Sequence, residues 1–490
     1  MSDPSSALKI GKRTFLTAVA ILGILMLLAG ILTLVVPAGS YERIAADGRE
    51  MIDPGSFHYT PEADYPVWRW LTAPVEVLAG PDGPTVLVII FFILSIAAAF
   101  SLLEKSGVLA EMISRIVKRF EKRKYLLLSA IVLFFMLLGA VLGTFEENIA
   151  LVPIVIALAH FLGWDSLVGL GMSILASCFG FAAAISNPFS IAITQKLSGL
   201  PLYSGSGYRI IIFIFFYLLV DVFLIRYARK IERKPELSLV YAEDAPLRAR
   251  YSAKGAFSGL ENGGFDAGNA RLGRAMACFI VFMGLIFAAI IAASMLEGLS
   301  DLIMPIIGVL FLAGGIIASG MAGLKAETGW STVYKGILGM APGIVLILMA
   351  MSVKFIISMG GIMDTILHGA AYAISGMSPY AAVFMIYVLV LVLELFIGSS
   401  SAKAFLIMPI VAPLADLIGV TRQSSVLAFC FGDGFSNVLY PTNPVLLICL
   451  GLTVVSYPRW FKWTIKLQLA AFAASCVFLA AAVALKLGPF

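Results

Sequence analysis

Two adjacent glutamates interrupt a strongly apolar part of the chain. The sequence GTFEEN, at residues 143–148, lies between the runs LLLSAIVLFFMLLGAVL and IALVPIVIALAHFLG. Ionised side chains at membrane depth are costly, and those that occur there usually serve function. We therefore expect Glu146 and Glu147 to meet a cationic group, with Thr144 and Asn148 beside them. The alternative is structural, because Thr144 and Glu147 have the spacing of a capping box that would start the next helix.

A second polar stretch, GSSSAK, ends at Lys403 and precedes another apolar run. Its hydroxyl groups, on Ser399, Ser400 and Ser401, could bind a carboxylate. Lys403 falls in the first turn of the expected helix, at the positive end of the helix dipole, where a cation is disfavoured. Two interpretations remain open: Lys403 forms a salt bridge with Glu147, or it is a built-in cation that alternates with substrate or proton.

Two Asn-Pro pairs should interrupt other helices, because the residue before a proline disfavours the helical conformation. They occur in SNPFS (186–190) and TNPVL (442–446), which adds Ser186, Asn187, Thr442 and Asn443 to the candidate binding residues. They could also be simple helix breakers. Asp433 lies one to two turns before the second break and is the candidate ion-coupling residue.

Three more charges lie in apolar stretches, and each has a less specific interpretation. Asp221 and Lys354 could form an ion pair in the scaffold or lie near a membrane surface. Glu394 could be structural or functional.

A shift of 256 residues aligns the two halves of the chain without a gap. Pro153 falls on Pro409, Gly163 on Gly419, Phe179 on Phe435, and Asn187-Pro188 on Asn443-Pro444. The same register places residues 143–145 on 399–401, and Glu147 on Lys403. Matching apolar residues could arise by chance in so apolar a chain, but shared proline, glycine and Asn-Pro positions are harder to obtain that way. We therefore predict an internal repeat.

Composition indicates a polytopic helical membrane protein. The 490 residues are 60% hydrophobic and 13% charged, about half the charged fraction of a typical soluble protein. Several apolar runs are long enough to span a bilayer. The five cysteines occur singly, which argues against a metal site or a disulfide framework. The net charge of +5 lies mostly in loops, where it sets orientation rather than binding nucleic acid.

The positive-inside rule orients the chain. Basic clusters near the N-terminus, in an amphipathic segment at 104–125, in RYARKIERK and around Arg459 should all be cytoplasmic, so the N-terminus is cytoplasmic. The linker 227–271 is expected to be a solvated loop. Residues 126–163 then form a re-entrant hairpin that opens inward, and residues 380–419 form one that opens outward. Inverted repeats with broken helices are typical of secondary transporters.

The long motifs GTFEENIALVPIVIALAHFLGWDS, SNPFSIAITQKLSGLPLYSGSGYRI and VLAFCFGDGFSNVLYPTNP, together with VPAGSY, resemble the YfcC-type membrane proteins. That family is related to anaerobic C4-dicarboxylate carriers and arginine/ornithine antiporters of the ion transporter superfamily. The resemblance implies an all-α elevator-type transporter of the bacterial cytoplasmic membrane, usually a homodimer. The expected domains are scaffold segments at 1–125, 207–378 and 458–490, and transport segments at 126–206 and 379–457.

Where the wider superfamily has Ser-Asn-Thr motifs at its hairpin tips, this chain has GTF and SSS. The leading hypothesis is exchange or co-transport of a small amino acid, expected to be cationic, as in arginine/ornithine exchange. An ion-coupled C4-dicarboxylate carrier is the alternative. Na⁺ or H⁺ is the expected coupling ion, and we expect no other cofactor. No nucleophile–base spacing supports an enzyme, and paired inverted hairpins suit alternating access better than a channel pore.

Overall fold

The computed structural model describes residues 12–46, 49–61, 65–120, 123–251, 270–295 and 302–488. These residues are nearly all helical, apart from two small antiparallel sheets. Strand β1 (Gly39–Ser40) pairs with β4 (His58–Tyr59), and β2 (Arg43–Ala46) pairs with β3 (Arg49–Ile52). The expected all-helical membrane architecture is therefore correct in its main feature. Residues 1–11 and residues 252–269 of the expected linker lie outside the described ranges.

The helices of the first half are short where the sequence carries glycine, proline or polar breaks. In chain order they are α1 (Lys12–Val35), α2 (Arg69–Glu76), α3 (Gly83–Lys105), α4 (Val108–Phe120), α5 (Lys124–Leu137), η3 (Leu138–Leu142), η4 (Glu147–Leu151), α6 (Val152–Phe161), α7 (Ser166–Leu170), η5 (Gly171–Leu175), α8 (Ala176–Ala183), η6 (Pro188–Ala192), α9 (Ile193–Leu197) and α10 (Ser206–Arg233). Three of these pieces, η3, η5 and η6, are π-helical turns, a geometry frequent at functional sites.

Most helices of the second half are longer and more regular than those of the first half. They are η7 (Pro235–Leu237), α11 (Ala245–Tyr251), α13 (Ala270–Met295), α14 (Ile303–Met321), α15 (Ala326–Met359), α16 (Met363–Ile374), α17 (Pro379–Glu394), α18 (Ser400–Ile418), α19 (Arg422–Ser436), α20 (Pro444–Gly451) and α21 (Tyr457–Ala484). Within the described residues, ten helical segments are long and apolar enough to cross a membrane. In a bilayer core, a helix satisfies all its backbone hydrogen bonds internally.

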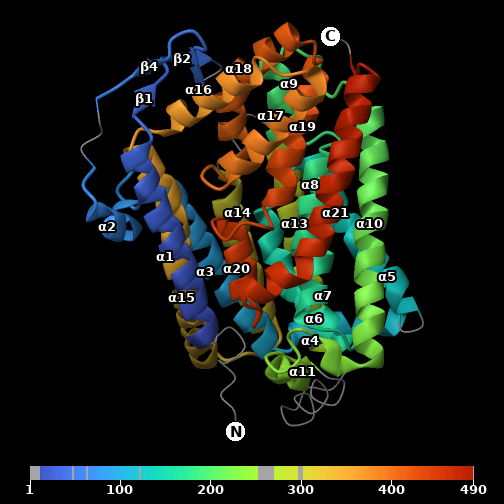
Figure 1. The fold of residues 1–490 in the computed structure, drawn as a ribbon. Coiled ribbons are helices and arrows are strands. Elements are labelled where there is room, and N and C mark those ends of the chain that lie inside the picture. Colours follow the sequence, from blue (N-terminus) through green and yellow to red (C-terminus); the bar gives the residue numbers. More distant parts are fainter. Residues whose placement is uncertain are drawn as a thin grey trace.

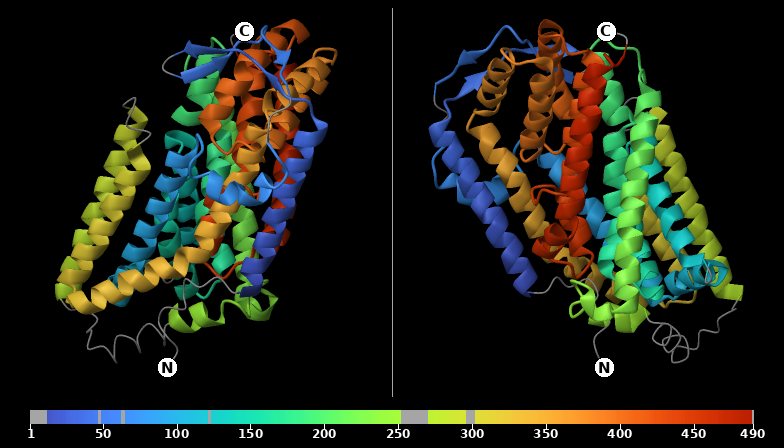
Figure 2. Two further views of the ribbon diagram at one scale, coloured as in Figure 1. Left: turned by 90° about the vertical axis from the view of Figure 1, so that its left-hand side faces the viewer. Right: turned by 45° about the vertical axis from the view of Figure 1, so that its right-hand side comes forward.

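The two ends of the molecule differ in character (Figures 1 and 2). The start of α1, together with α4 and α11, lies at one end, and the strands, α16 and the end of α21 lie at the other. The basic segments and the strand-bearing segment after α1 are therefore at opposite ends, as the charge pattern requires.

The helices pack in two groups. In one group, α3 contacts α14 and α15, α14 contacts α13, and α15 contacts α1. In the other group, α8 contacts α5, α10 and α19, while α19 contacts α17 and α21. The segment Ser166–Leu197 is the most deeply buried of the candidate spans, with 94% of its most apolar window inside the protein. The breaks at 186–190 and 399–403 adjoin the second group, whereas α20, which follows the break at 442–446, packs on α15 of the first group.

The expected solvated linker is exposed at 232–237, but it contains a buried anchor at Asp244. Asp244 is buried, and its carboxylate accepts hydrogen bonds from the N–H and the hydroxyl of Ser166 at 2.8 and 2.7 Å. Asp165 accepts from the hydroxyls of Tyr227 and Ser238, each at 2.7 Å. Residues after α10 are thus tied to the corner between α6 and α7, because buried carboxylates need such donors.

Candidate functional site

The GTFEEN segment forms a tight turn between η3 and η4. Gly143 has φ of +70°, which favours glycine, and a Cβ there would lie 2.1 Å from Asn187 Oδ1. The backbone N–H of Phe145 donates to the carboxylate of Glu147 at 3.2 Å. The hydroxyl of Thr144 donates to Asn148 Oδ1 at 3.3 Å instead of capping Glu147. The turn therefore departs from the capping-box alternative and presses against the break that follows α8.

Asn148 ties this turn to the adjacent helix. Its amide nitrogen donates to the carbonyl of Thr144 at 2.9 Å and to the hydroxyl of Ser177, on α8, at 2.8 Å. Asn148 and Ser177 are both buried. Asn148 is therefore satisfied by the protein itself, and it positions the turn against α8.

The two glutamates have different surroundings. Glu147 is 8% exposed and closes the turn through Phe145. Glu146 is half-buried, and within the described part of the chain it has no recorded hydrogen bond or ion pair. A half-buried carboxylate beside a second one attracts a cation. Of the pair, Glu146 is the group available to an incoming ligand.

The two Asn-Pro breaks have the same cap geometry. Asn187 Oδ1 accepts from the N–H groups of Phe189 and Ser190 at 2.8 and 3.2 Å. Asn443 Oδ1 accepts from those of Val445 and Leu446 at 3.0 and 3.3 Å. Each asparagine therefore starts a half-helix with a proline at its first position, an arrangement that proline tolerates because it lacks the N–H.

Some polar side-chain groups at the two Asn-Pro breaks have a hydrogen-bond partner and others have none among the described residues. Asn443 Nδ2 donates to Asn437 Oδ1 at 2.8 Å. Asn187 Nδ2 and Thr442 Oγ1 are buried without a hydrogen-bond partner among the described residues. Ser186 continues the contact with η3, since its N–H donates to the carbonyl of Ala140 at 3.0 Å. Buried polar atoms without partners are costly, so these two call for a ligand or water.

The serine tip opens α18. Ser399 is the N-cap, with its hydroxyl 3.4 Å from the N–H of Ala402 and 3.5 Å from the hydroxyl of Ser401. Ser400 donates to Asp433 Oδ2, on α19, at 2.5 Å. Ser399 is exposed, and Ser400 and Ser401 are half-buried. The tip therefore offers hydroxyls to a ligand while one of them already contacts α19.

Lys403 is completely buried in the first turn of α18, between two acids. Its ammonium lies 2.8 Å from Asp433 Oδ1 and forms an ion pair with Glu394, the last residue of α17. All three side chains are at most 1% exposed. The carboxylates thus hold a cation at the helix end where the dipole alone would disfavour it.

Two of the ion pairs that the sequence left open as alternatives do not form. Lys403 pairs with Glu394 and Asp433 instead of Glu147, because α17 ends at Glu394 and the last turn of α19 brings Asp433 beside the serine tip. Lys354 pairs with Asp82 at 2.8 Å rather than with Asp221. Sequence reasoning had no means to choose partners that depend on helix packing.

Elements from the two halves cross over one another. Helix α18 contacts η6 and α9 beyond the first break, and α20 beyond the second break contacts η4. The serine tip therefore lies near the first break as well as near α19, and the glutamate turn contacts elements beyond both breaks.

Three residues outside the predicted site take part in it. Glu394 balances Lys403, Ser177 binds Asn148, and Asn437 binds Asn443. The 256-residue shift places Ser177 on Asp433, so the register could have singled it out. Glu394 carried a signal as an acid in an apolar run.

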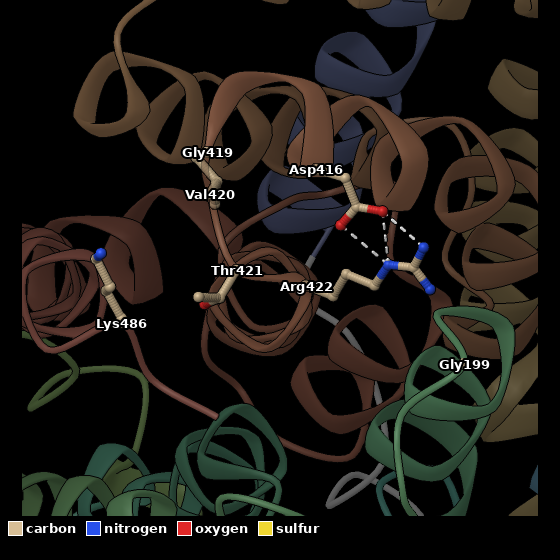
Figure 3. A pocket seen from close by; sticks show the side chains of 7 residues that line it. All are labelled: Gly199, Asp416, Gly419, Val420, Thr421, Arg422 and Lys486. Carbon is tan, nitrogen blue, oxygen red and sulfur yellow. Dashed lines mark hydrogen bonds and ion pairs between the residues drawn. The ribbon is translucent and has the colours of Figure 1, made fainter. Parts of the chain in front are cut away.

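One cavity, of about 560 Å³, lies away from the candidate site. It is lined by the turn between α18 and α19, by Gly199 and by Lys486 (Figure 3). Arg422 there is held by Asp416, with its Nη2 2.6 Å from Oδ2, and donates to the carbonyl of Ser198 at 2.7 Å. Among the described residues no group of three or more His, Cys, Asp or Glu could hold a metal ion.

These features define a multi-pass membrane protein of the transporter class, with polar turns and broken helices buried among apolar spans. The model of the DcuC family, described as C4-dicarboxylate anaerobic carrier, matches residues 15–484. The chain belongs to this family.

Two bacterial relatives extend the likeness. A protein of Escherichia coli strain K12 named "Putative basic amino acid antiporter YfcC" is 30% identical over 466 residues, covering 89% of this chain and 90% of that protein. An uncharacterised protein of Haemophilus influenzae is 26% identical over 379 residues, covering 77% and 72%. The expected YfcC-type family is confirmed.

Two solved structures are similar over most of their length. One is the YdaH transporter of Alcanivorax borkumensis, with a TM-score of 0.40 and 18% identity; the match covers 97% of this chain and 100% of that one. The other is the efflux pump MtrF of Neisseria gonorrhoeae, with a TM-score of 0.43 and 16% identity; the match covers 94% of each chain.

Proposed function

We propose that the protein is a secondary active transporter that exchanges a small cationic amino acid across the bacterial cytoplasmic membrane. The observation that carries the proposal is Glu146, a half-buried carboxylate without a described partner in a turn between apolar helices. Such a group favours an ammonium or guanidinium ligand. The name of the Escherichia coli relative, "Putative basic amino acid antiporter YfcC", supports the same substrate class.

The binding site would combine groups from both halves of the chain. Glu146 and Glu147 would meet the substrate cation, within the turn held by Thr144 and Asn148. The carboxylate of the substrate would accept hydrogen bonds from the serine tip (399–401) and from Asn187 Nδ2 and Thr442 Oγ1, which have no partner among the described residues. Ser186 and Asn443 would hold the backbone at the two breaks. Half-helix N-termini also favour a negative charge. Asp433 and Lys403 would belong to ion coupling.

An inverted repeat would place these groups at mid-membrane. Residues in the same register meet across the centre of the molecule: the rings of Phe179 and Phe435 are 5.0 Å apart, and Cys178 Sγ donates to the carbonyl of Gly434 at 2.9 Å. Such self-contacts are expected of residues near a pseudo-two-fold axis. In this scheme α5–α6 is a re-entrant hairpin open to the cytoplasm, and α17–α18 is one open to the other side.

Transport would then follow an elevator mechanism. The transport segments, 126–206 and 379–457, would move against the scaffold formed by 1–125, 207–378 and 458–490, within a homodimer whose N-termini are cytoplasmic. The packing of α3, α14, α15 and α1 as one group supports a scaffold body, and its α15 also contacts α20 of the second transport segment. Helices α10 and α21, which we place in the scaffold, contact α8 and α19 and would be the surface along which the transport segments move.

A C4-dicarboxylate carrier is the alternative, and the description of the matching family favours it. Lys403 would then counter the second carboxylate of the substrate. Its ammonium, however, is already engaged by Glu394 and Asp433. Glu146, among the described residues, has no cationic partner and would repel a dianion, so we place the cationic amino acid first.

Counterflow in proteoliposomes tests the proposal. Vesicles loaded with unlabelled arginine, ornithine or lysine should accumulate labelled arginine with saturation, and vesicles loaded with succinate should not. Saturation and counterflow would also separate a carrier from a channel. Accumulation of labelled succinate instead would support the dicarboxylate alternative and refute the cationic substrate.

The Glu146→Gln variant tests the site. It should raise the KM for arginine about tenfold, since a charge-assisted contact contributes roughly 1.4 kcal/mol or more, and it should melt close to the wild-type temperature. Glu327→Gln, at an exposed position at the start of α15, is the matched control and should change neither quantity. A Glu146→Gln protein with unchanged KM would remove Glu146 from the substrate site.

A further inference from the structure

The cluster of Glu394, Lys403 and Asp433 joins three helices at one buried point. Glu394 ends α17, Lys403 lies in the first turn of α18, and Asp433 lies on α19. Building on the proposed transport function, we propose that this cluster is a sodium-independent coupling site. In it, Lys403 occupies the place of a metal cation and the carboxylate pair carries one exchangeable proton.

The charge count of the cluster requires a further cation. Two carboxylates and one ammonium leave a formal charge of −1, and each of the three side chains is at most 1% exposed. A buried uncompensated charge costs several kcal/mol, and such groups take up a proton or a counter-ion instead. One proton on the carboxylate pair makes the cluster neutral.

Glu394 is the better carrier of that proton. Asp433 accepts from the Ser400 hydroxyl at 2.5 Å and lies 2.8 Å from the Lys403 ammonium. Glu394 has Lys403 as its recorded partner, and within the described residues neither of its oxygens has a hydrogen bond. Donors stabilise the ionised form of a carboxylate, so the acid with fewer donors is the one that accepts a proton more readily.

The ammonium of Lys403 takes the position that a monovalent metal ion would need. It sits between carboxylate oxygens of two helices and forms an ion pair with each of them. A sodium ion entering the same oxygens would meet a like charge on a tethered chain. The site therefore carries its own permanent cation, and the exchanged ion is the proton.

The cluster can transmit its protonation state to the serine tip. Ser400 belongs to the tip and binds Asp433, while Asp433 also holds Lys403. Loss of the proton leaves the two carboxylates competing for one ammonium, which changes the support of the first turn of α18. The tip that would bind the substrate carboxylate is thus linked to the proton through one hydrogen bond.

The helices packed around the cluster carry other ionisable side chains. Cys430 of α19 and Cys178 of α8 face Asp433, and Arg209 of α10 faces Cys430. On α16, which contacts α18, Asp364 is held by Arg43 at 2.9 Å and His368 lies 3.1 Å from the hydroxyl of Tyr41. Further cations on described elements that pack against α18 are Lys196 of α9, Arg422 of α19 and Arg49 of β3.

The first arm of the test needs no substrate. Thermal unfolding of the purified protein is measured in sodium chloride and in choline chloride at equal ionic strength, for wild type, Lys403→Ala and Lys354→Ala. We expect sodium to raise the melting temperature of Lys403→Ala alone, because an ion that binds the folded state stabilises it by mass action. Specific stabilisation of the wild type by sodium would overturn the proposal, whether or not Lys403→Ala folds. A folded Lys403→Ala protein whose melting temperature is the same in sodium chloride and in choline chloride would overturn the role of Lys403.

The second arm measures arginine counterflow from about pH 5 to about pH 9. The wild-type rate should change about tenfold per pH unit over part of this range, as expected for one proton, and Glu394→Gln should show a flat profile. Lys354→Ala, whose partner is Asp82, should keep the wild-type profile. A wild-type profile in Glu394→Gln would refute the proton site. Failure of the wild type to exchange any amino acid would instead refute the transport proposal, and the sodium arm would still decide the role of Lys403.

Discussion

Replacing Lys403 by Met should be among the most destabilising changes in the second half of the chain. The substitution keeps most of the side-chain volume but leaves Glu394 and Asp433 without their shared ammonium in a fully buried position. Removing one partner of a buried ion pair costs about 3–5 kcal/mol. Lys354→Met is the matched control, since its pair with Asp82 is 28% and 31% exposed. A pair with that much solvent contact contributes about 0–1 kcal/mol.

The assay is thermal unfolding of detergent-solubilised protein followed by intrinsic fluorescence. Lys403→Met should melt several degrees below Lys354→Met, at equal pH and salt. The double variant Lys403→Met/Glu394→Gln should recover about 1–2 kcal/mol relative to Lys403→Met, because contacting residues are not additive. Equal melting temperatures for the two lysine variants, or no recovery in the double variant, would refute the buried three-charge cluster.

Two further predictions concern other parts of the fold. Gly143→Ala should lower the free energy of unfolding by about 2–4 kcal/mol, because the new Cβ would combine a left-handed backbone with a contact at 2.1 Å to Asn187. Gly107→Ala is the control: Gly107 has φ of +80° and open space around it, so the loss should be about 1–2 kcal/mol in the same melting assay. Equal losses of stability in the two variants would contradict the close contact at Gly143. Burial raises the pKa of Asp244 to about 6 from 3.8, so the folded state binds this proton more tightly and its contribution to stability is lost as pH rises from about 4 to about 6. The loss is at most about 3 kcal/mol, and melting curves of Asp244→Asn across that window should lack the wild-type decline; an identical decline would show that Asp244 does not titrate there.

The sequence predicted best those features that depend on local chemistry. Asn187 and Asn443 start half-helices as their Asn-Pro context suggests, since the cap needs only residues two and three positions later. The apolar spans and the position of Lys403 in the first turn of α18 follow from composition and helix-start signals in the same way. Each of these features involves only residues close in sequence.

The partners of the charges could not be predicted, because they depend on packing between distant helices. Lys403 could be assigned to Glu147 only by analogy with the repeat register, whereas its ammonium meets Glu394 and Asp433. The docking of Asp244 onto Ser166 was missed for the same reason, since 78 residues separate them and the segment has a polar composition that suggests a loop. A buried carboxylate in a polar segment leaves little trace in sequence.

The contacts between Phe179 and Phe435, and between Cys178 and Gly434, have a consequence for biosynthesis. The two halves of each contact are 256 residues apart, and at about 5–20 residues per second a ribosome needs roughly 13–50 s to add that length. During this interval α8 is already inserted, but α19, which covers much of it, has not been made. The face of α8 that α19 covers in the complete protein must then be shielded by α5 and α10 alone, or by the insertion machinery. Folding of the first half should therefore stay incomplete until the second half leaves the ribosome, and a chain truncated after the linker should be a substrate for membrane proteolysis.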